Sequence, residues 1–255
     1  PPAEPGISRK LEKGTDIVVQ LHYHPSGKVE RDRSSLGFYW SEPPSKGVAT
    51  VIMLNTNLYL PAGSAETRVQ SSMTMPQDGE LFAIAPHAHY LGKEMKVDAH
   101  LPDGSVTPLL WIKDWDFNWQ GQYRYETPVK LPKGTRVEME FSYDNSAGNP
   151  QNPSSPPKMV RWGEQTTDEM AVTFLGILLP KPEDVAPFQR STMGQMIQGI
   201  LTGLETLDDL PPEIPPAMVQ QLKTMLAIFD RNRDGKFDDG ERATMKAAIG
   251  MLLPQ

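Results

Sequence analysis

The sequence predicts a mainly β fold, an antiparallel jelly roll or β-sandwich, followed by a small α-helical region. The chain has 255 residues, of which 38% are hydrophobic, enough for one large core and a small appendage. Its 20 glycines and 25 prolines favour many short strands and turns over long helices. Short runs of β-forming residues recur up to about residue 179, and the pattern becomes helical after Pro180.

The β-like part of the chain is predicted to span residues 14–180. Residues 1–13 are rich in proline and charge, and we expect a linker from a missing upstream domain. The clearest predicted strands are 17–24, 67–75, 81–90, 136–143 and 170–178. In the first of these, alternation predicts that Ile17, Val19, Leu21 and Tyr23 face the core. Trp115, Phe117 and Trp119 also alternate as in a strand, which predicts core packing.

After Pro180 the sequence predicts a helical tail. Segment 181–216 is interpreted as a Pro-rich and helical linker, with a helix over 188–207 and a break at 211–216. Residues 217–255 are predicted to form two helices around an acidic loop. We expect the break to uncouple this last unit, in part, from the β domain.

The acidic loop 230–241 matches the spacing of a calcium-binding EF-hand at each ligand position. Its oxygen donors are Asp230, Asn232, Asp234, the carbonyl of Lys236, Asp238 and the bidentate Glu241. The alternative is a solvated acidic turn, which the matched positions and helical flanks disfavour. No second loop is evident in the sequence, so the helix over 188–207 is a candidate for the position of the usual partner hand.

Charge and cysteine content exclude several classes of function. The net charge is −7 with the acidic residues spread out, which argues against nucleic acid and anionic membrane surfaces as partners. No stretch approaches the roughly 20 apolar residues of a membrane span. There is no cysteine, so disulfides, zinc–thiolate sites and cysteine nucleophiles are excluded. The lack of a usable glycosylation acceptor favours a bacterial protein, which we expect to be periplasmic or extracellular.

Four of the five histidines form two His-x-His pairs, His22 with His24 and His87 with His89. Residues two apart in a strand point to the same side, so each pair can present two imidazoles together. In the run 81–90, the pair is expected to share a face with Leu81, Ala83 and Ala85. The alternative is a half-exposed surface position, and imidazoles alone fit zinc, copper, nickel or iron.

Three motifs then show a resemblance to a known family. They are Pro86-His-Ala-His-Tyr-Leu-Gly-Lys93, Thr166-Thr-Asp-Glu-Met170, and the segment Gln20-Leu-His-Tyr-His-Pro-Ser-Gly-Lys28. Together they resemble the copper type II, ascorbate-dependent monooxygenases, such as the peptidylglycine and dopamine monooxygenases. The resemblance covers about residues 14–178, with the motifs in the expected order. It implies the C-terminal, jelly-roll half of such an enzyme.

The resemblance also implies roles for particular residues. His87, His89 and Met170 would bind the oxygen-activating copper and carry the catalysis, and His22 would serve a second, electron-transferring copper. Taken alone, Met170 is more simply a core residue, but a thioether beside two imidazoles suits copper, especially Cu(I). Asp168 and Glu169 either orient ligands or form a turn at the start of the strand. The complete enzyme would hydroxylate a C–H bond of a small molecule or peptide with O2 and electrons from ascorbate or a similar donor.

The sequence departs from the family in one important respect. The family's electron-transfer copper needs an adjacent His-His pair, and this chain has none. We therefore expect an upstream β domain, or an electron-donor domain of the same protein, to complete that site, and little turnover by the chain alone. The alternative function is a non-catalytic copper- and calcium-binding module of a larger extracytoplasmic bacterial protein.

Overall fold

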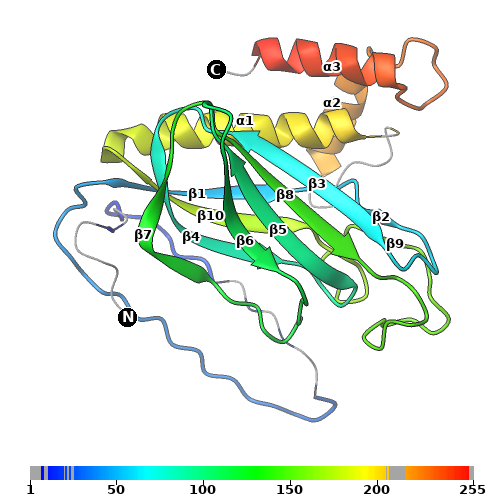
Figure 1. Ribbon diagram of the computed structural model, residues 1–255, viewed down its shortest axis with the longest axis horizontal. Helices are drawn as coiled ribbons and strands as arrows, with labels where there is room; N and C mark the ends of the chain where they lie inside the picture. The colour runs from blue at the N-terminus through cyan, green and yellow to red at the C-terminus, as the bar shows by residue number, and fades with distance from the viewer. Residues whose placement is uncertain are drawn as a thin grey trace.

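The computed structural model describes residues 7–8, 11–19, 21, 23, 26–204, 206 and 216–252. Its centre is a sandwich of two four-stranded antiparallel sheets (Figure 1). The first sheet has the order β1 (Gly47–Leu54), β10 (Val172–Leu179), β4 (Gly79–His87), β7 (Tyr123–Leu131). The second has the order β3 (Thr67–Thr74), β8 (Arg136–Tyr143), β5 (Gly92–His100), β6 (Val106–Ile112). A small pair, β2 (Tyr59–Leu60) and β9 (Val160–Arg161), forms a separate two-stranded ladder. The predicted mainly β, antiparallel sandwich is confirmed.

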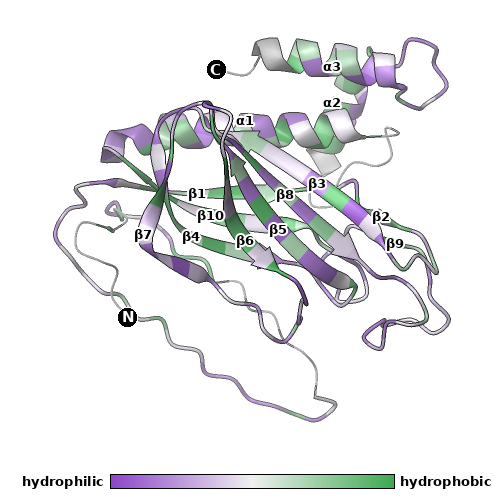
Figure 2. Ribbon diagram, in the orientation of Figure 1, coloured by the Kyte–Doolittle hydropathy of each residue, from purple (hydrophilic) through white to green (hydrophobic). Residues whose placement is uncertain are grey.

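The core lies between the two sheets because the strands alternate in hydropathy. In β8, Val137, Met139 and Phe141 are fully buried, whereas Arg136 at the start of the strand is exposed. Figure 2 shows the resulting bands of hydrophobic and hydrophilic residues along the strands. Burying each large apolar side chain stabilises the fold by about 1.5–3 kcal/mol, so this pattern fixes which side of each strand faces the core.

The helices follow the last strand and stack on one side of the sandwich. They are η1 (Pro182–Asp184), α1 (Val185–Gly203), α2 (Pro216–Leu226) and α3 (Asp239–Leu252). Helix α1 lies between the sandwich and α3 (Figure 1). Its Phe188 belongs to the sandwich core, and its Leu201 belongs to a second, smaller core in the tail. The described part of the predicted linker is therefore packed structure. No helix of the described ranges is long and apolar enough to cross a lipid bilayer.

The predicted strand over 17–24 is wrong for the residues that the structure describes there. Ile17, Val19, Leu21 and Tyr23 are between 48% and 65% exposed, and no β ladder of the described residues includes them. The first strand begins only at Gly47. Alternation predicts a face, but a strand also needs a neighbour for its backbone groups. His22 and His24 lie outside the described residues, so the predicted role of His22 stays a prediction.

Candidate metal centre

His87 and His89 lie together at the end of β4. His87 is the last residue of the strand, and His89 lies two residues further on, just before the turn that begins at Tyr90. Their ring centroids are 5.2 Å apart and the ring planes are nearly perpendicular. Two imidazole nitrogens that bind one ion at about 2.0–2.1 Å with a tetrahedral angle place the ring centres about 5 Å apart. The observed separation therefore suits a shared metal ion.

One part of the predicted strand geometry is wrong. Leu81 lies in the sandwich core, but His87 lies on the opposite face of β4, beside Ala85. The cause is a β-bulge: β10 pairs Gly176 with Ala83 and the next residue, Ile177, with Leu81, so Phe82 is an extra residue. The extra residue reverses the alternation, as bulges do. A Cβ added at Gly176 would meet Phe82 and Ala83 together, which places both on the outer side with His87.

Each of the two histidines has an oxygen acceptor at its Nδ1. His87 Nδ1 is 2.6 Å from Oε1 of Gln120, whose own amide nitrogen donates to the carbonyl of Phe117. His89 Nδ1 is 3.1 Å from the carbonyl oxygen of Asp168. Metal-binding histidines usually donate their second ring N–H to such an acceptor, which fixes the tautomer and leaves Nε2 for the metal. Burial lowers the pKa of both imidazoles, which keeps them neutral and able to bind a cation.

A buried carboxylate ties Met170 to the turn that carries His89. Oε1 of Glu169 accepts the backbone N–H of His89 and, at 2.8 Å, that of Met170, and Oε2 accepts the N–H of Leu91 at 2.9 Å. Glu169 is fully buried, and burial raises its pKa to about 7, although the backbone N–H donors lower it. Tyr143 also donates to the carbonyl of Met170 at 2.8 Å.

The strand register agrees with this placement. In the pairing of β4 with β10, His87 lies opposite Val172. Continued by two residues, the same antiparallel register brings Met170 opposite His89. The structure thus places His87, His89 and Met170 at the same end of one strand pair.

The loop between β6 and β7 supplies contacts to the two histidines that the sequence did not predict. Trp115 is buried and donates from its indole nitrogen to the carbonyl of His89 at 3.1 Å. The ring of Phe117 meets that of His89 edge-on, with 5.9 Å between centroids, and Gln120 contacts His87. The predicted strand alternation of Trp115, Phe117 and Trp119 is wrong, because the segment is a loop and Trp119 is 72% exposed. The predicted core packing is confirmed for Trp115.

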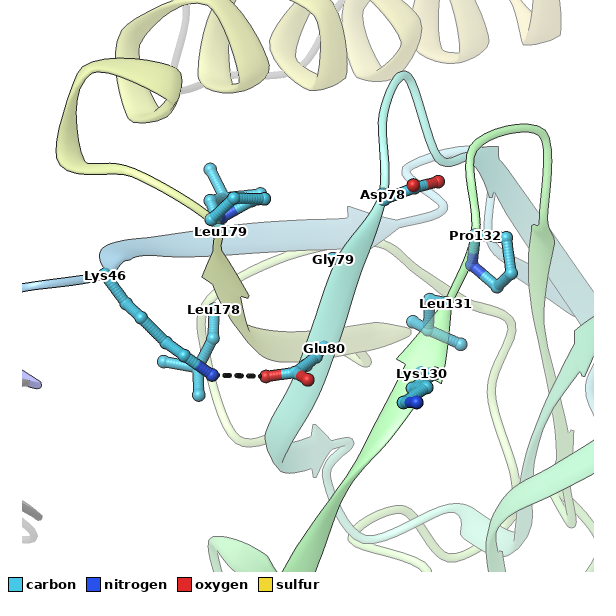
Figure 3. A pocket seen from close by; sticks show the side chains of 10 residues that line it. Lys46, Asp78, Gly79, Glu80, Lys130, Leu131, Pro132, Leu178 and Leu179 are labelled. Carbon is cyan, nitrogen blue, oxygen red and sulfur yellow. Dashed lines mark hydrogen bonds and ion pairs between the residues drawn. The ribbon is translucent and has the colours of Figure 1, made fainter.

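A hollow lies elsewhere, at the opposite end of β4. It has a volume of about 360 Å³ and is lined by residues that include Gly79, Glu80 and Lys130 (Figure 3). Lys46 forms an ion pair with Glu80 there at 2.6 Å, drawn as a dashed line in Figure 3. This hollow contains none of the predicted ligands, so the histidine pair and the hollow are separate features.

The predicted calcium loop makes its sharp turn at the glycine of position 6 and is held by its own side-chain oxygens. Gly235 has a φ of 78°, and side-chain oxygens of Asp230, Asn232 and Asp234 accept loop N–H groups at 2.8–3.0 Å. Glu241 is buried and accepts the N–H groups of Arg231 and Asp238. Oδ1 of Asp230 is buried without a partner, and a cation would satisfy it.

Neither predicted site is a ready-made cluster of acidic and imidazole ligands. Among the described residues, no three His, Cys, Asp or Glu side chains are grouped as metal ligands. The predicted copper site counts a methionine, Met170, as the third donor beside the histidine pair. In the calcium loop, backbone amides hold the carboxylates, so these would have to converge on the ion as it binds.

Comparison with protein-family models and with curated proteins gives no match. Among solved structures, the chain is similar to the family 32 CBM from C. perfringens NanJ in complex with galactose. That similarity has 10% identity and a TM-score of 0.23, over 50% of this chain and 93% of the other. The VP2 subviral particle of infectious bursal disease virus aligns at 7% identity and a TM-score of 0.26, over 60% of this chain and 39% of that one. Similarities this weak carry no argument about function.

Proposed function

We propose that this chain is the copper-binding domain of a copper- and O2-dependent monooxygenase and that it carries a calcium-binding EF-hand. The complete enzyme hydroxylates a C–H bond with electrons from ascorbate or a similar donor. The main support is the pair His87 and His89, each with Nδ1 on an oxygen acceptor, beside a methionine held in register with them. Two imidazoles and a thioether suit copper in both of its common oxidation states. Bound copper would supply one-electron and O2 chemistry.

The chain's own residues prepare this site for the metal. Gln120 and the carbonyl of Asp168 hold the Nδ1 protons, so both histidines present Nε2. The rings of Tyr90 and Phe117 lie 4.4 Å apart, and Phe117 covers one side of His89, which limits the access of water. An apolar wall of this kind also suits a substrate that reacts at a C–H bond. The electron-transfer copper, including His22, would be completed by another domain of the same extracytoplasmic protein.

Replacement of Met170 by leucine is expected to remove a sulfur neighbour from bound Cu(I). X-ray absorption of the Cu(I)-loaded protein should show two nitrogen donors and one sulfur, and only the nitrogens in Met170→Leu. The matched control is Met159→Leu, because Met159 is 50% exposed. If the sulfur signal survives in Met170→Leu, the three-ligand assignment is wrong. Copper-dependent oxygen uptake with ascorbate by the complete protein then separates an enzyme from a non-catalytic copper module.

Replacement of Gln120 by leucine should weaken copper binding about 10- to 100-fold, the usual effect of losing such a supporting hydrogen bond. The leucine keeps the approximate size of the side chain but leaves Nδ1 of His87 without its acceptor. Competition with a Cu(I) chelator measures the affinity. Gln122, an exposed residue of the same loop, provides the control variant Gln122→Leu. Equal affinities for the two variants would contradict the role of Gln120.

A further inference from the structure

The EF-hand loop pairs with the chain's own segment directly after α1. Lys236 forms an isolated antiparallel bridge with Thr206. The next residue, Phe237, is buried in the small core that also contains Leu201 and Leu204. The end of α1 and the segment after it therefore pack against the loop, and the sequence had made this helix a candidate for the position of a partner hand. Gln198 of α1 also donates to the carbonyl of Lys246 in α3 at 2.9 Å.

The same helix is fixed to the β-sandwich at its other end. Phe188 is 1% exposed within the sandwich core. Seven residues further along α1, the side-chain amide of Gln195 makes two hydrogen bonds to the backbone of Thr74 in β3, both 2.8 Å long. A helix of this length spans about 28 Å, so a single rigid element reaches both cores.

The end of α1 also contacts the loop between β1 and β2, and this loop is hydrogen-bonded to the residue that follows the predicted copper ligand Met170. Gly203 has no space for a Cβ, because the side chain of Asn57 fills it. The N–H of Asn57 is bonded to Oδ1 of Asn55 at 2.8 Å. The N–H of Asn55 is in turn bonded to the carbonyl of Ala171 at 3.1 Å, next to Met170. A continuous series of contacts therefore joins the calcium loop to the start of β10.

We propose that calcium binding in the loop 230–241 is transmitted through α1 to the hydrogen bonds around Met170, so that calcium and copper strengthen each other's binding. The copper half of this inference rests on the proposed function. An ion that binds only the ordered form of the loop stabilises every contact that this ordered form requires, including the contacts with α1. Such coupling is reciprocal. If calcium raises the copper affinity by a certain factor, copper must raise the calcium affinity by the same factor.

Hydrogen exchange of the copper-free protein tests the first half of the inference. Calcium is expected to slow exchange at the amides of Asn55 and Thr74 at least about fivefold in the wild type, and to leave both unchanged in Glu241→Gln. Glutamine at this position removes the charge of the bidentate ligand. If calcium protects only residues 216–252, the inference is wrong and the tail is an independent unit.

A second variant separates loss of the route from loss of the calcium site. Asn57→Ala removes the side chain that contacts Gly203 at the end of α1 but keeps the backbone N–H bonded to Asn55, and the loop 230–241 stays intact. It should bind calcium and yet lose the calcium-dependent protection at Asn55. Gln189→Met, at an exposed position of α1, should keep that protection. Protection at Asn55 that persists in Asn57→Ala would show that the contact between α1 and Asn57 is not the route.

Calcium titrations with and without bound Cu(I) test the second half. Copper is expected to raise the calcium affinity at least about fivefold in the wild type and to have no effect in Asn57→Ala. An unchanged affinity in the copper-loaded wild type would overturn the coupling to Met170. Failure of copper to bind at all would instead overturn the proposed function together with this copper half, and the exchange experiment would still decide the first half.

Discussion

Glu169→Gln is expected to lower the free energy of unfolding by about 3 kcal/mol and to disturb the proposed copper site. The carboxylate accepts backbone N–H groups from His89, Leu91 and Met170 inside a site closed to solvent. Glutamine has nearly the same shape, so it creates no cavity. It does replace one carboxylate oxygen by an NH2 group, which is itself a donor. At least one of the backbone N–H groups that the oxygen accepted then loses its acceptor. Each buried donor left unpaired costs about 1–3 kcal/mol.

Chemical denaturation measures the loss of stability, with Glu164→Gln as the control because Glu164 is exposed in the preceding loop. X-ray absorption of the Cu(I) form supplies a second measurement. If Glu169 holds Met170 in place, the sulfur neighbour should weaken in Glu169→Gln while the two nitrogen donors remain. A variant as stable as the wild type, with an unchanged copper spectrum, would show that the carboxylate does not organise this site.

Phe188→Ala is expected to cost about 3–5 kcal/mol of stability, the usual range for deleting a buried phenylalanine. Phe188 is 1% exposed and lies in the sandwich core although it belongs to α1. The truncation leaves a cavity beneath the helix, so it should also loosen the attachment of the tail. Calcium-dependent protection at Asn55 is then expected to disappear.

The control is Met193→Ala, since Met193 is 51% exposed on the same helix. That variant should change the stability by less than about 1 kcal/mol and leave calcium-dependent protection intact. Denaturant unfolding and hydrogen exchange are measured on both proteins. A Phe188→Ala protein that keeps full stability would place α1 outside the cooperative core of the sandwich.

The sandwich was predictable because its strands carry their own pattern. The predicted strand 136–143 coincides with β8, and 67–75 exceeds β3 by one residue. In both, alternation within eight residues is enough to separate the inner from the outer face. The segment 17–24 has a similar pattern, but a pattern does not supply the neighbouring strand, and the described residues there lie in no ladder. The alternation within a segment predicted which side of a strand faces the core. It did not predict whether the segment pairs with a neighbouring strand.

At the candidate site, the sequence indicated the candidate ligands but not the residues that support them. His87, His89 and Met170 belong to short motifs, whereas Gln120 and Trp115 reach the histidines from 26 to 33 residues away in the sequence. No spacing rule connects a loop amide to an imidazole at that distance. The position of α1 was hidden for the same reason, since Gln195 meets Thr74 across 121 residues. Contacts made across the fold depend on how elements pack, which a single sequence does not state.

The extra residue in β4 has a consequence for how such sites vary between related genes. Because Phe82 is left out of the pairing with β10, Leu81 and His87 are each fixed by their own partner, Ile177 and Val172. Loss of one codon at this point would straighten the strand and keep both partners. The number of residues between Leu81 in the core and His87 is therefore free to change by one while the imidazoles keep their positions. A search that demands a constant spacing would overlook relatives whose histidine pair is unchanged.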